Sequence, residues 1–298
     1  MKNGLIIINK PEGISSHSVV SRVKRALGAK KAGHTGTLDP MATGVLPVLL
    51  ERGVKASEYM LCDDKHYRAT LLLGITTDTE DITGKTLSVS EEIPAEKEVT
   101  DAVFSMIGKS FQTPPMYSAI KIGGKKLYEL ARLGQVVERE KREINVYEII
   151  PEKINDKEYS IDVKCSKGTY IRTLCADIGK KLGCGAVMKT LERLEAGGFT
   201  IDEAITLEAL EAMSDAEREK HILPVESVFK DFVRVKLPDF FARLAACGLE
   251  IYLEKINLTL DIGERVTLYN KNGFFALGEV MLFEAGPAIK PIKQFEIQ

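Results

Sequence analysis

The chain has 298 residues, 44% of them hydrophobic, and is therefore long enough to bury the core of one or two domains. Its net charge of −2 excludes a protein that is basic or acidic throughout. No run of 18 apolar residues and no signal-peptide pattern occurs, which argues against a membrane protein and predicts a soluble, cytoplasmic one.

The cysteines argue against two kinds of site. They include no C-x-x-C pair, and no histidine lies at ligand spacing, which does not fit a zinc site. Their odd number does not fit a closed disulfide framework. We therefore expect no metal ion, and we expect the thiols to be small, buried hydrophobic groups. The five are Cys62, Cys165, Cys175, Cys184 and Cys247.

The first third of the chain alternates strands and helices. Residues 4–9 are an apolar run typical of a short buried strand, and the turn at 10–13 leads into a helix capped by Ser15 or Ser16. Apolar side chains on one face of this helix, and Gly28 at its end, support the assignment. Strands are next expected at 45–50 and 67–73, and a helix at 97–107.

The middle of the chain contains a polar excursion, residues 116–143, which begins after the Pro114-Pro115 pair. A short helix is expected at 125–133 within it, and its charged composition predicts a place outside the core. Strands at 144–150 and 159–165 and a helix at 169–182 follow.

After about Asp231 the pattern changes to short strands. They are expected at 233–235, 266–269, 274–280 and the end of the chain. Residues 270–273, Asn-Lys-Asn-Gly, form a predicted hairpin turn. We infer a small β-rich C-terminal domain.

Residues 33–40, Gly-His-Thr-Gly-Thr-Leu-Asp-Pro, carry the carboxylate that most suggests a reaction. Gly33 and Gly36 allow a positive φ or a close backbone approach, and Pro40 keeps Asp39 out of the α region, so the loop can hold that side chain in one position. Two other interpretations stay open here. The loop could be an ordinary Asp-Pro turn, or a phosphate cradle in a nucleotide-binding enzyme, although no P-loop or dinucleotide-binding pattern is present.

The charge is unevenly distributed along the near-neutral chain. Residues 13–38 hold five basic side chains and no acidic one, and residues 164–193 hold seven basic and two acidic. Residues 202–231 hold nine acidic and three basic. Basic tracts of this kind can form a surface that follows a phosphate backbone, or they can be ordinary solvated helix faces.

Five motifs occur in order along the chain. They are NKPEGISS at 9–16, GHTGTLDP at 33–40, KHYR at 65–68, QTPPMYSA at 112–119 and KGTYIRT at 167–173. Together they resemble the bacterial TruB family of tRNA pseudouridine synthases, and the similarity runs from about Gly4 to Gly198. Residues 273–279 resemble the small PUA-like RNA-binding domain at the end of that family.

The resemblance implies an α+β fold in two domains. Residues 1–231 would form a pseudouridine synthase core, with a mixed, mostly antiparallel sheet flanked by helices. Residues 232–298 would form the β-rich PUA-like domain. Because residues 116–143 are charged and flanked by glycines, we expect this insertion to be an RNA clamp that orders on binding.

The resemblance also implies an activity, the isomerisation of uridine 55 in the T arm of tRNA to pseudouridine by base flipping, with no cofactor. The partner would be the T-arm stem-loop, and the enzyme a monomer. A non-catalytic RNA-binding or tRNA-folding protein that uses the same basic face is the alternative.

By this resemblance, three residues would carry the chemistry. Asp39 matches the catalytic aspartate, and it needs a fixed position more than an activating base because it is ionised at neutral pH. Tyr67 matches the active-site tyrosine that would stack on uracil and help to remove the C5 proton. Arg172, expected one turn into its helix, matches the arginine that would pair with Asp39.

The resemblance assigns four further residues to substrate binding. His34 would enter the space left by the flipped nucleotide. Lys10 and Pro11 would lie near the catalytic loop, with Lys10 close to the RNA or supporting the loop. Leu191 would line the uracil pocket, although plain core packing is the other interpretation. Residues 51–55, Glu-Arg-Gly-Val-Lys, depart from the family's Gly-x-Ala-Thr-Lys pattern, which puts the local turn in doubt.

Overall fold

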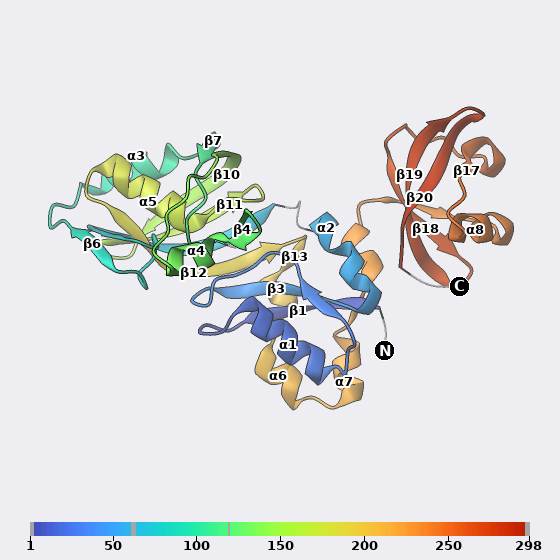
Figure 1. The fold of residues 1–298 in the computed structure, drawn as a ribbon, viewed down its shortest axis with the longest axis horizontal. Coiled ribbons are helices and arrows are strands. Elements are labelled where there is room, and N and C mark those ends of the chain that lie inside the picture. The colour runs from blue at the N-terminus through green and yellow to red at the C-terminus, as the bar shows by residue number, and fades with distance from the viewer. Residues whose placement is uncertain (1–2, 61–63, 119, 296–298) are drawn as a thin grey trace.

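A large mixed sheet forms the centre of the molecule in the computed structural model, which describes residues 3–60, 64–118 and 120–295 (Figure 1). Its main path runs β14-β1-β3-β12-β4-β11-β10-β7. Neighbours on this path are antiparallel except β1 with β14 and β3 with β12. The strands are β1 (Gly4–Lys10), β3 (Thr43–Leu50), β4 (Lys65–Leu73), β7 (Gly108–Gln112), β10 (Arg142–Lys153), β11 (Glu158–Cys165), β12 (Ala186–Ala196) and β14 (Ile205–Thr206). The predicted mixed, mostly antiparallel α+β core is confirmed.

Helices cover the two ends of this sheet. α1 (Ser16–Ala26) and α6 (Leu207–Ala212) pack against β1 and β3, where the Ser15 hydroxyl caps α1 by accepting a hydrogen bond from the Ser18 amide at 3.1 Å. α3 (Glu96–Phe104) and α5 (Ile171–Leu182) pack against β10, β12 and β4 around a second core. The central strands thereby hold both cores together (Figure 1).

Shorter elements fill the edges of the sheet and the loops. The remaining strands and α-helices before the C-terminal sheet are β2 (Ala32–His34), α2 (Ser57–Met60), β5 (Ile75–Thr77), β6 (Thr86–Val89), β8 (Lys121–Ile122), β9 (Lys125–Lys126), α4 (Leu127–Arg132), β13 (Phe199–Thr200), α7 (Asp215–Lys220) and β15 (Leu223–Pro224). The predicted polar excursion is thus a β8–β9 hairpin followed by α4. No helix in the described ranges is long and apolar enough to cross a membrane.

The C-terminal residues form a separate five-stranded sheet, at the right of Figure 1. Its order is β16-β18-β19-β20-β17, with a helix packed beside it. The hairpin turn predicted at 270–273 joins β18 to β19. The elements are β16 (Val233–Lys236), α8 (Asp239–Ala246), β17 (Ile251–Tyr252), β18 (Arg265–Asn270), β19 (Gly273–Phe283) and β20 (Gly286–Gln294).

An aromatic cluster joins the two sheets. The ring of Phe229, which is 2% exposed, lies 5.3 Å from Tyr59, 5.6 Å from Phe232, 6.0 Å from Phe274 and 5.6 Å from Phe295 between ring centroids. Phe274 and Phe295 come from the C-terminal part of the chain, so their contacts with Phe229 fasten the C-terminal sheet to the rest of the protein.

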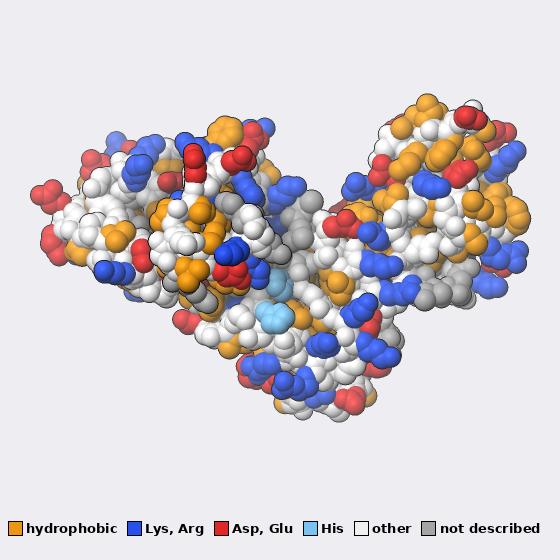
Figure 2. Space-filling view, in the orientation of Figure 1, with side chains coloured by type: hydrophobic (Ala, Val, Ile, Leu, Met, Phe, Trp, Pro, Cys, Tyr) orange, Lys and Arg blue, Asp and Glu red, His pale blue; other side chains and the backbone are white. Residues whose placement is uncertain are grey.

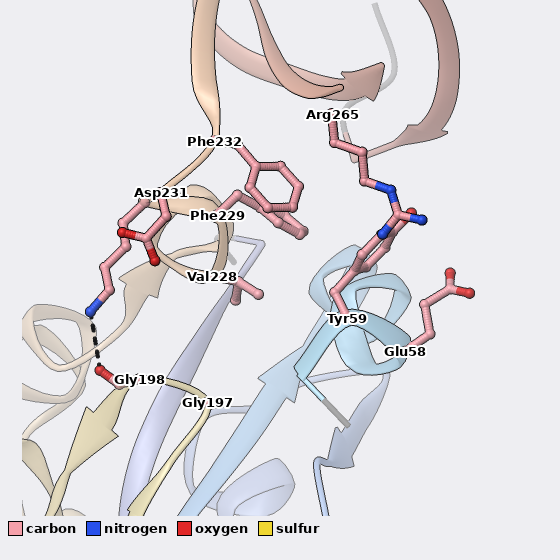
Figure 3. A pocket seen from close by; sticks show the side chains of 10 residues that line it. Glu58, Tyr59, Gly197, Gly198, Val228, Phe229, Asp231, Phe232 and Arg265 are labelled. Carbon is pink, nitrogen blue, oxygen red and sulfur yellow. Dashed lines mark hydrogen bonds between the residues drawn. The ribbon is translucent and has the colours of Figure 1, made fainter. Parts of the chain in front are cut away.

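A cleft of about 590 Å³ opens beside this cluster (Figure 3). Arg265 of the C-terminal sheet lies over the ring of Tyr59, 5.7 Å from its centroid. Across the cleft, the Lys230 ammonium donates to the Gly198 carbonyl at 3.3 Å. The apolar cluster and the contact of Arg265 with Tyr59 therefore hold the two parts together, whereas the bond from Lys230 to Gly198 lies within the part that precedes the C-terminal sheet.

The unusual turn at residues 51–55 takes part in the same junction. It is a 3-10 helix over Glu51–Ala56, in which Glu51 has a φ of 53° and its carboxylate accepts the Lys30 amide at 2.6 Å. Lys55 donates to the carbonyl of Gln294 in β20 at 2.9 Å. Although residues 51–55 depart from the family's sequence pattern, Lys55 binds the C-terminal sheet through this hydrogen bond.

Three sequence expectations need correction. Strand β12 was not expected, although it lies at the centre of the sheet, and α8 was missed in a segment expected to be β-rich. Cys247 is exposed, whereas the other described cysteines are buried as expected, and Cys62 lies outside the described residues. Cys247 follows α8, whose amphipathic pattern leaves that position on the outside.

Candidate active site

Residues of the first motif, at 9–16, hold the loop that carries Asp39 through hydrogen bonds. The Ser16 hydroxyl donates to the Leu38 carbonyl and accepts from the Leu38 amide, both at 2.9 Å. The Gly13 amide donates to the Pro40 carbonyl at 2.8 Å. Backbone bonds on both sides of Asp39 thus fix the position of its side chain.

Lys10 is the third support of this loop, and it is fully buried. Its ammonium donates to the carbonyls of Ala42 at 2.6 Å, Pro11 at 2.9 Å and Pro40 at 3.2 Å. Burial lowers the pKa of Lys10 to about 8, against the opposing effect of Asp39, so the charged form still dominates at neutral pH. The sequence left two positions open for Lys10, close to the RNA or in support of the loop, and in the structure its ammonium binds the carbonyls of the loop.

Lys10→Met is expected to lower the free energy of unfolding by about 1–3 kcal/mol, because buried carbonyl groups lose their donor. Urea unfolding followed by circular dichroism measures the change. The matched control is Lys24→Met, at an exposed position on α1, which is expected to stay within about 0.5 kcal/mol of the wild type. Equal losses for the two variants would contradict the supporting role of Lys10.

Arg172 joins Asp39 to a second carboxylate. Its Nε lies 3.1 Å from Oδ2 of Asp39, and its Nη1 lies 3.5 Å from Oδ2 of Asp81. The guanidinium also donates to the carbonyls of Tyr117 at 2.7 Å and Thr79 at 3.2 Å. Arg172 is the second residue of α5, in the first turn and earlier in the helix than expected. Acceptors from two other loops, Thr79 and Asp81 in one and Tyr117 in the other, therefore hold the guanidinium against Asp39.

Burial and the charge of Arg172 have opposite effects on the pKa of the Asp39 carboxyl. Its side chain is 36% exposed, while those of Arg172 and Asp81 are 6% and 7% exposed. Burial raises the pKa of Asp39, and Arg172 opposes that rise. The result is a carboxylate that reaches the surface at one end and is held by a buried charge pair at the other.

Asp81 was not singled out from the sequence. It accepts hydrogen bonds from the Thr79 hydroxyl at 2.8 Å and from the Thr83 amide and hydroxyl at 2.9 and 2.6 Å. In the sequence it stands in an acidic, threonine-rich turn that reads as solvated loop, so no local signal distinguished it.

Tyr67 and Leu191 lie on the neighbouring central strands β4 and β12. Leu191 is 8% exposed and belongs to the same apolar cluster as Leu38, with Tyr67 packed against it. Burial raises the pKa of Tyr67. The structure therefore brings the Asp39 loop, the Tyr67 strand and Leu191 together.

His34 ends strand β2, which pairs with β3 beside the loop. Its Nδ1 is buried and has no hydrogen-bond partner among the described residues. Burial lowers the pKa of this imidazole, helped by the charge of Arg193. Gly36 has the expected positive φ of 80°, whereas Gly33 lies in β2 without one, so only Gly36 needs to be glycine for its conformation.

The first basic tract forms an exposed surface on α1 and the loop after it. Arg22 is paired there with Glu211 at 2.5 Å, and the remaining cations face solvent. Figure 2 shows Lys and Arg side chains over this part of the molecule. The exposed basic side chains are Lys24, Arg25, Lys30 and Lys31.

The second basic tract does not form one face. Arg172 and Arg193 are buried in the fold. Lys164 pairs with Glu148 of the adjacent strand β10, and Lys189 pairs with Glu158 of β11, which lies beyond β4. The sum of charges along the sequence therefore overstates the positive surface at 164–193, because charges close in sequence point to different places.

Comparison with known proteins agrees with this arrangement. The family model described as TruB family pseudouridylate synthase (N-terminal domain) matches residues 24–171, and that for the tRNA pseudouridylate synthase B C-terminal domain matches 172–230. The chain is 45% identical over 280 residues to a tRNA pseudouridine synthase B of Alkaliphilus oremlandii, covering 93% of each chain. It is 44% identical over 277 residues to that of Clostridium novyi, covering 93% of this chain and 95% of the relative.

A solved structure is similar over nearly the whole chain. It is a chain in the crystal structure of a Cbf5-Nop10-Gar1 complex, with a TM-score of 0.71 and 26% sequence identity, covering 99% of this chain and 86% of that one. The chain therefore belongs to the TruB family of tRNA pseudouridine synthases, isomerases that act on tRNA.

Proposed function

We propose that this enzyme isomerises uridine 55, in the T arm of tRNA, to pseudouridine. The observation that carries the proposal is the Asp39–Arg172 ion pair at 3.1 Å, backed by Asp81 and placed on a loop with a partly exposed tip. It holds a lone carboxylate ionised and oriented where a nucleotide could reach it. The isomerisation needs no other reactant, and we propose no cofactor.

In the proposed reaction, Asp39 acts beside the ribose while the N1–C1′ bond breaks. The detached uracil turns within the site, C5 bonds to C1′, and the proton on C5 leaves. Tyr67 stacks on the base and removes that proton, and Leu191 forms the apolar wall of the pocket. Arg172 keeps Asp39 ionised and oriented, and Lys10 is a positioning residue for the loop.

Uridine must leave the T-arm stack to reach Asp39, which costs a few kcal/mol of stacking. We propose that His34 enters the space left by the flipped nucleotide. The position of His34 at the end of β2, beside the loop that carries Asp39, supports this proposal. Pro11, between Lys10 and Gly13 in the supporting turn, would contact the same nucleotide region.

We further propose that residues 1–231 form the catalytic domain and 232–298 a PUA-like RNA-binding domain. The five-stranded C-terminal sheet supports this division. Residues 116–143 would clamp the RNA, as the exposed hairpin and short helix suggest. Limited proteolysis of this segment should slow when a T-arm stem-loop is added to the monomer, and equal cleavage would count against a clamp.

Mapping of pseudouridine in total tRNA, at single-nucleotide resolution, tests the proposed function. Wild-type enzyme is expected to modify position 55, and Asp39→Ala to give no product while still binding a T-arm stem-loop. Asp162→Asn is the control, because this aspartate pairs with Arg68 on a different face. Product from Asp39→Ala at the wild-type rate, or modification at another position only, would overturn the proposal.

The exposed basic surface on α1 should set the salt dependence of RNA binding. Replacing Lys24, Arg25, Lys30 and Lys31 by glutamine removes up to four phosphate contacts, so the slope of log K against log salt should become less negative by as much as about 3 to 4. Titration of a labelled T-arm stem-loop at several salt concentrations measures the slope. An unchanged slope would show that the RNA follows another surface.

A further inference from the structure

Arg193 is a buried cation for which no role has been given. It is 1% exposed, on the central strand β12. Its Nε donates to the Val45 carbonyl at 2.7 Å and its Nη2 to the Gly36 carbonyl at 3.2 Å. Within the described ranges, no carboxylate lies within ion-pair distance of it.

Such an arrangement is costly for stability alone. A buried charge without an opposite charge retains most of its desolvation penalty, and apolar side chains of similar volume are often as stable in its place. Burial accordingly lowers the pKa of Arg193, and the nearby phenol of Tyr67 opposes this effect. The contacts of the Arg193 guanidinium therefore indicate a role in the active site rather than in stability alone.

The first of these contacts is with Tyr67. Arg193 stands directly opposite Tyr67 in the β12–β4 ladder, and a bulge follows between Arg193 and Glu195. The two side chains are close enough for the charge of Arg193 to act on the phenol. Burial raises the pKa of Tyr67 and Arg193 opposes that rise, while Cys165 and Asp39 add to it more weakly.

The second contact is with the catalytic loop. A Cβ added at Gly36 would lie 3.3 Å from Nη1 of Arg193, so the tip of the guanidinium lies directly against the turn three residues before Asp39. On the other side, a Cβ at Gly44 would lie 2.2 Å from the Arg193 carbonyl oxygen, and only glycine allows β3 to approach β12 so closely. Arg193 therefore contacts three parts of the site, which are strand β4 with Tyr67, strand β3, and the turn at Gly36.

We propose that Arg193 is a positioning residue, which holds the phenol of Tyr67 and the turn at Gly36 in one arrangement around the uracil. This inference rests on the proposed function, in which Tyr67 removes the C5 proton. In that step the proton on C5 passes to the Tyr67 oxygen, and the C5–H electron pair forms the C5–C6 double bond. The C6–N1 π pair becomes a lone pair on N1, and Tyr67 returns the proton to N1.

The test compares Arg193→Met with the wild type under single-turnover conditions, on T-arm stem-loops that carry uridine or [5-²H]uridine at the target. We expect Arg193→Met to lower the rate by about 10- to 100-fold, part of the 10²- to 10⁴-fold that a positioned base contributes. We also expect a larger ratio of the two isotopic rates than in the wild type, because proton removal becomes slower. Arg193→Lys, which keeps the charge but loses the forked geometry, should lie between them.

A double-mutant cycle with Tyr67→Phe completes the test. Once the phenol is absent, Arg193→Met should cost little further rate. Arg218→Met is the control, because Arg218 also donates to backbone carbonyls, those of Leu210 and Ala26 at 2.9 and 2.8 Å, which belong to α6 and α1 and not to the loop that carries Asp39. It should lower stability without changing the isotope ratio.

Several results would overturn the inference. An unchanged rate, a lowered rate with an unchanged isotope ratio, or additive losses with Tyr67→Phe would each show that Arg193 serves the fold alone. If Arg193→Met does not fold, the same ratio and cycle are measured with Arg193→Lys. Absence of pseudouridine with the wild type would instead overturn the proposed function and the inference with it.

Discussion

Replacing Arg172 by methionine is expected to lower the rate of pseudouridine formation by about 10²- to 10³-fold, the usual cost of losing one oriented charge in an active site. Arg172 is the cation that holds Asp39 at 3.1 Å and separates it from Asp81. Without it, two carboxylates would face each other with no positive charge between them. Initial rates on a T-arm stem-loop measure the effect.

The same variant should shift the pH dependence of the reaction in a definite direction. Burial already raises the pKa of Asp39, and Arg172 opposes that rise, so its removal raises the pKa further. Since the reaction proposed above uses the ionised carboxylate, activity should be lost as pH falls through this pKa. The acid limb of the pH–rate profile should therefore move to higher pH in Arg172→Met.

Two further variants serve as comparisons for the shift of the acid limb in Arg172→Met. Asp81→Asn keeps the contact between Arg172 and Asp39 but removes the competing carboxylate, so its acid limb should not move to higher pH. Arg68→Met removes an exposed guanidinium next to Tyr67 that pairs with Asp162, and its profile should match the wild type. An acid limb unchanged in Arg172→Met would show that Asp39 does not depend on this ion pair.

Phe229→Ala is expected to lower the free energy of unfolding by about 3–5 kcal/mol, as for other large aromatic side chains removed from a core. The ring is 2% exposed and contacts aromatic rings from both parts of the chain. Its loss should also loosen the C-terminal sheet from the catalytic part. Urea unfolding gives the stability, and faster proteolysis between the two parts reports the loosening.

Phe240→Ala provides the comparison, since Phe240 is 58% exposed on α8 and its aromatic contact is with Phe241 of the same helix. It should cost less than about 1 kcal/mol and leave proteolysis unchanged. If the two variants lost similar stability, or if proteolysis of Phe229→Ala were unchanged, the aromatic cluster would not be the fastening between the sheets.

Much of the fold could be predicted because its elements show ordinary periodicity. The strand at β3, the helix α1 with its Ser15 cap and the hairpin at 270–273 all carry clear local signals. Strand β12 carries none, since Ala, Met, Leu, Glu and Arg favour helices and its bulges at Met188/Thr190 and Arg193/Glu195 break the alternation of a strand. Tertiary pairing on both sides makes it a strand.

The site could be predicted only where the motifs of the family mark it. Asp39, Tyr67 and Arg172 stand in such motifs, and the structure brings Asp39 and Arg172 into contact. Asp81 and Arg193 were missed because their importance comes from partners far away in sequence. A buried arginine next to leucine and glutamate has the same appearance in a sequence as a surface one, and only the packing of β12 distinguishes them.

The order of the strands has a consequence for synthesis of the enzyme. β12 lies between β3 and β4, yet it follows the Asp39 loop by about 150 residues. At roughly 5–20 residues per second, the ribosome makes the loop about 8–30 s before the strand that supports it. The central sheet of the nascent chain therefore stays incomplete during that interval, because β3 and β4 are joined only through β12.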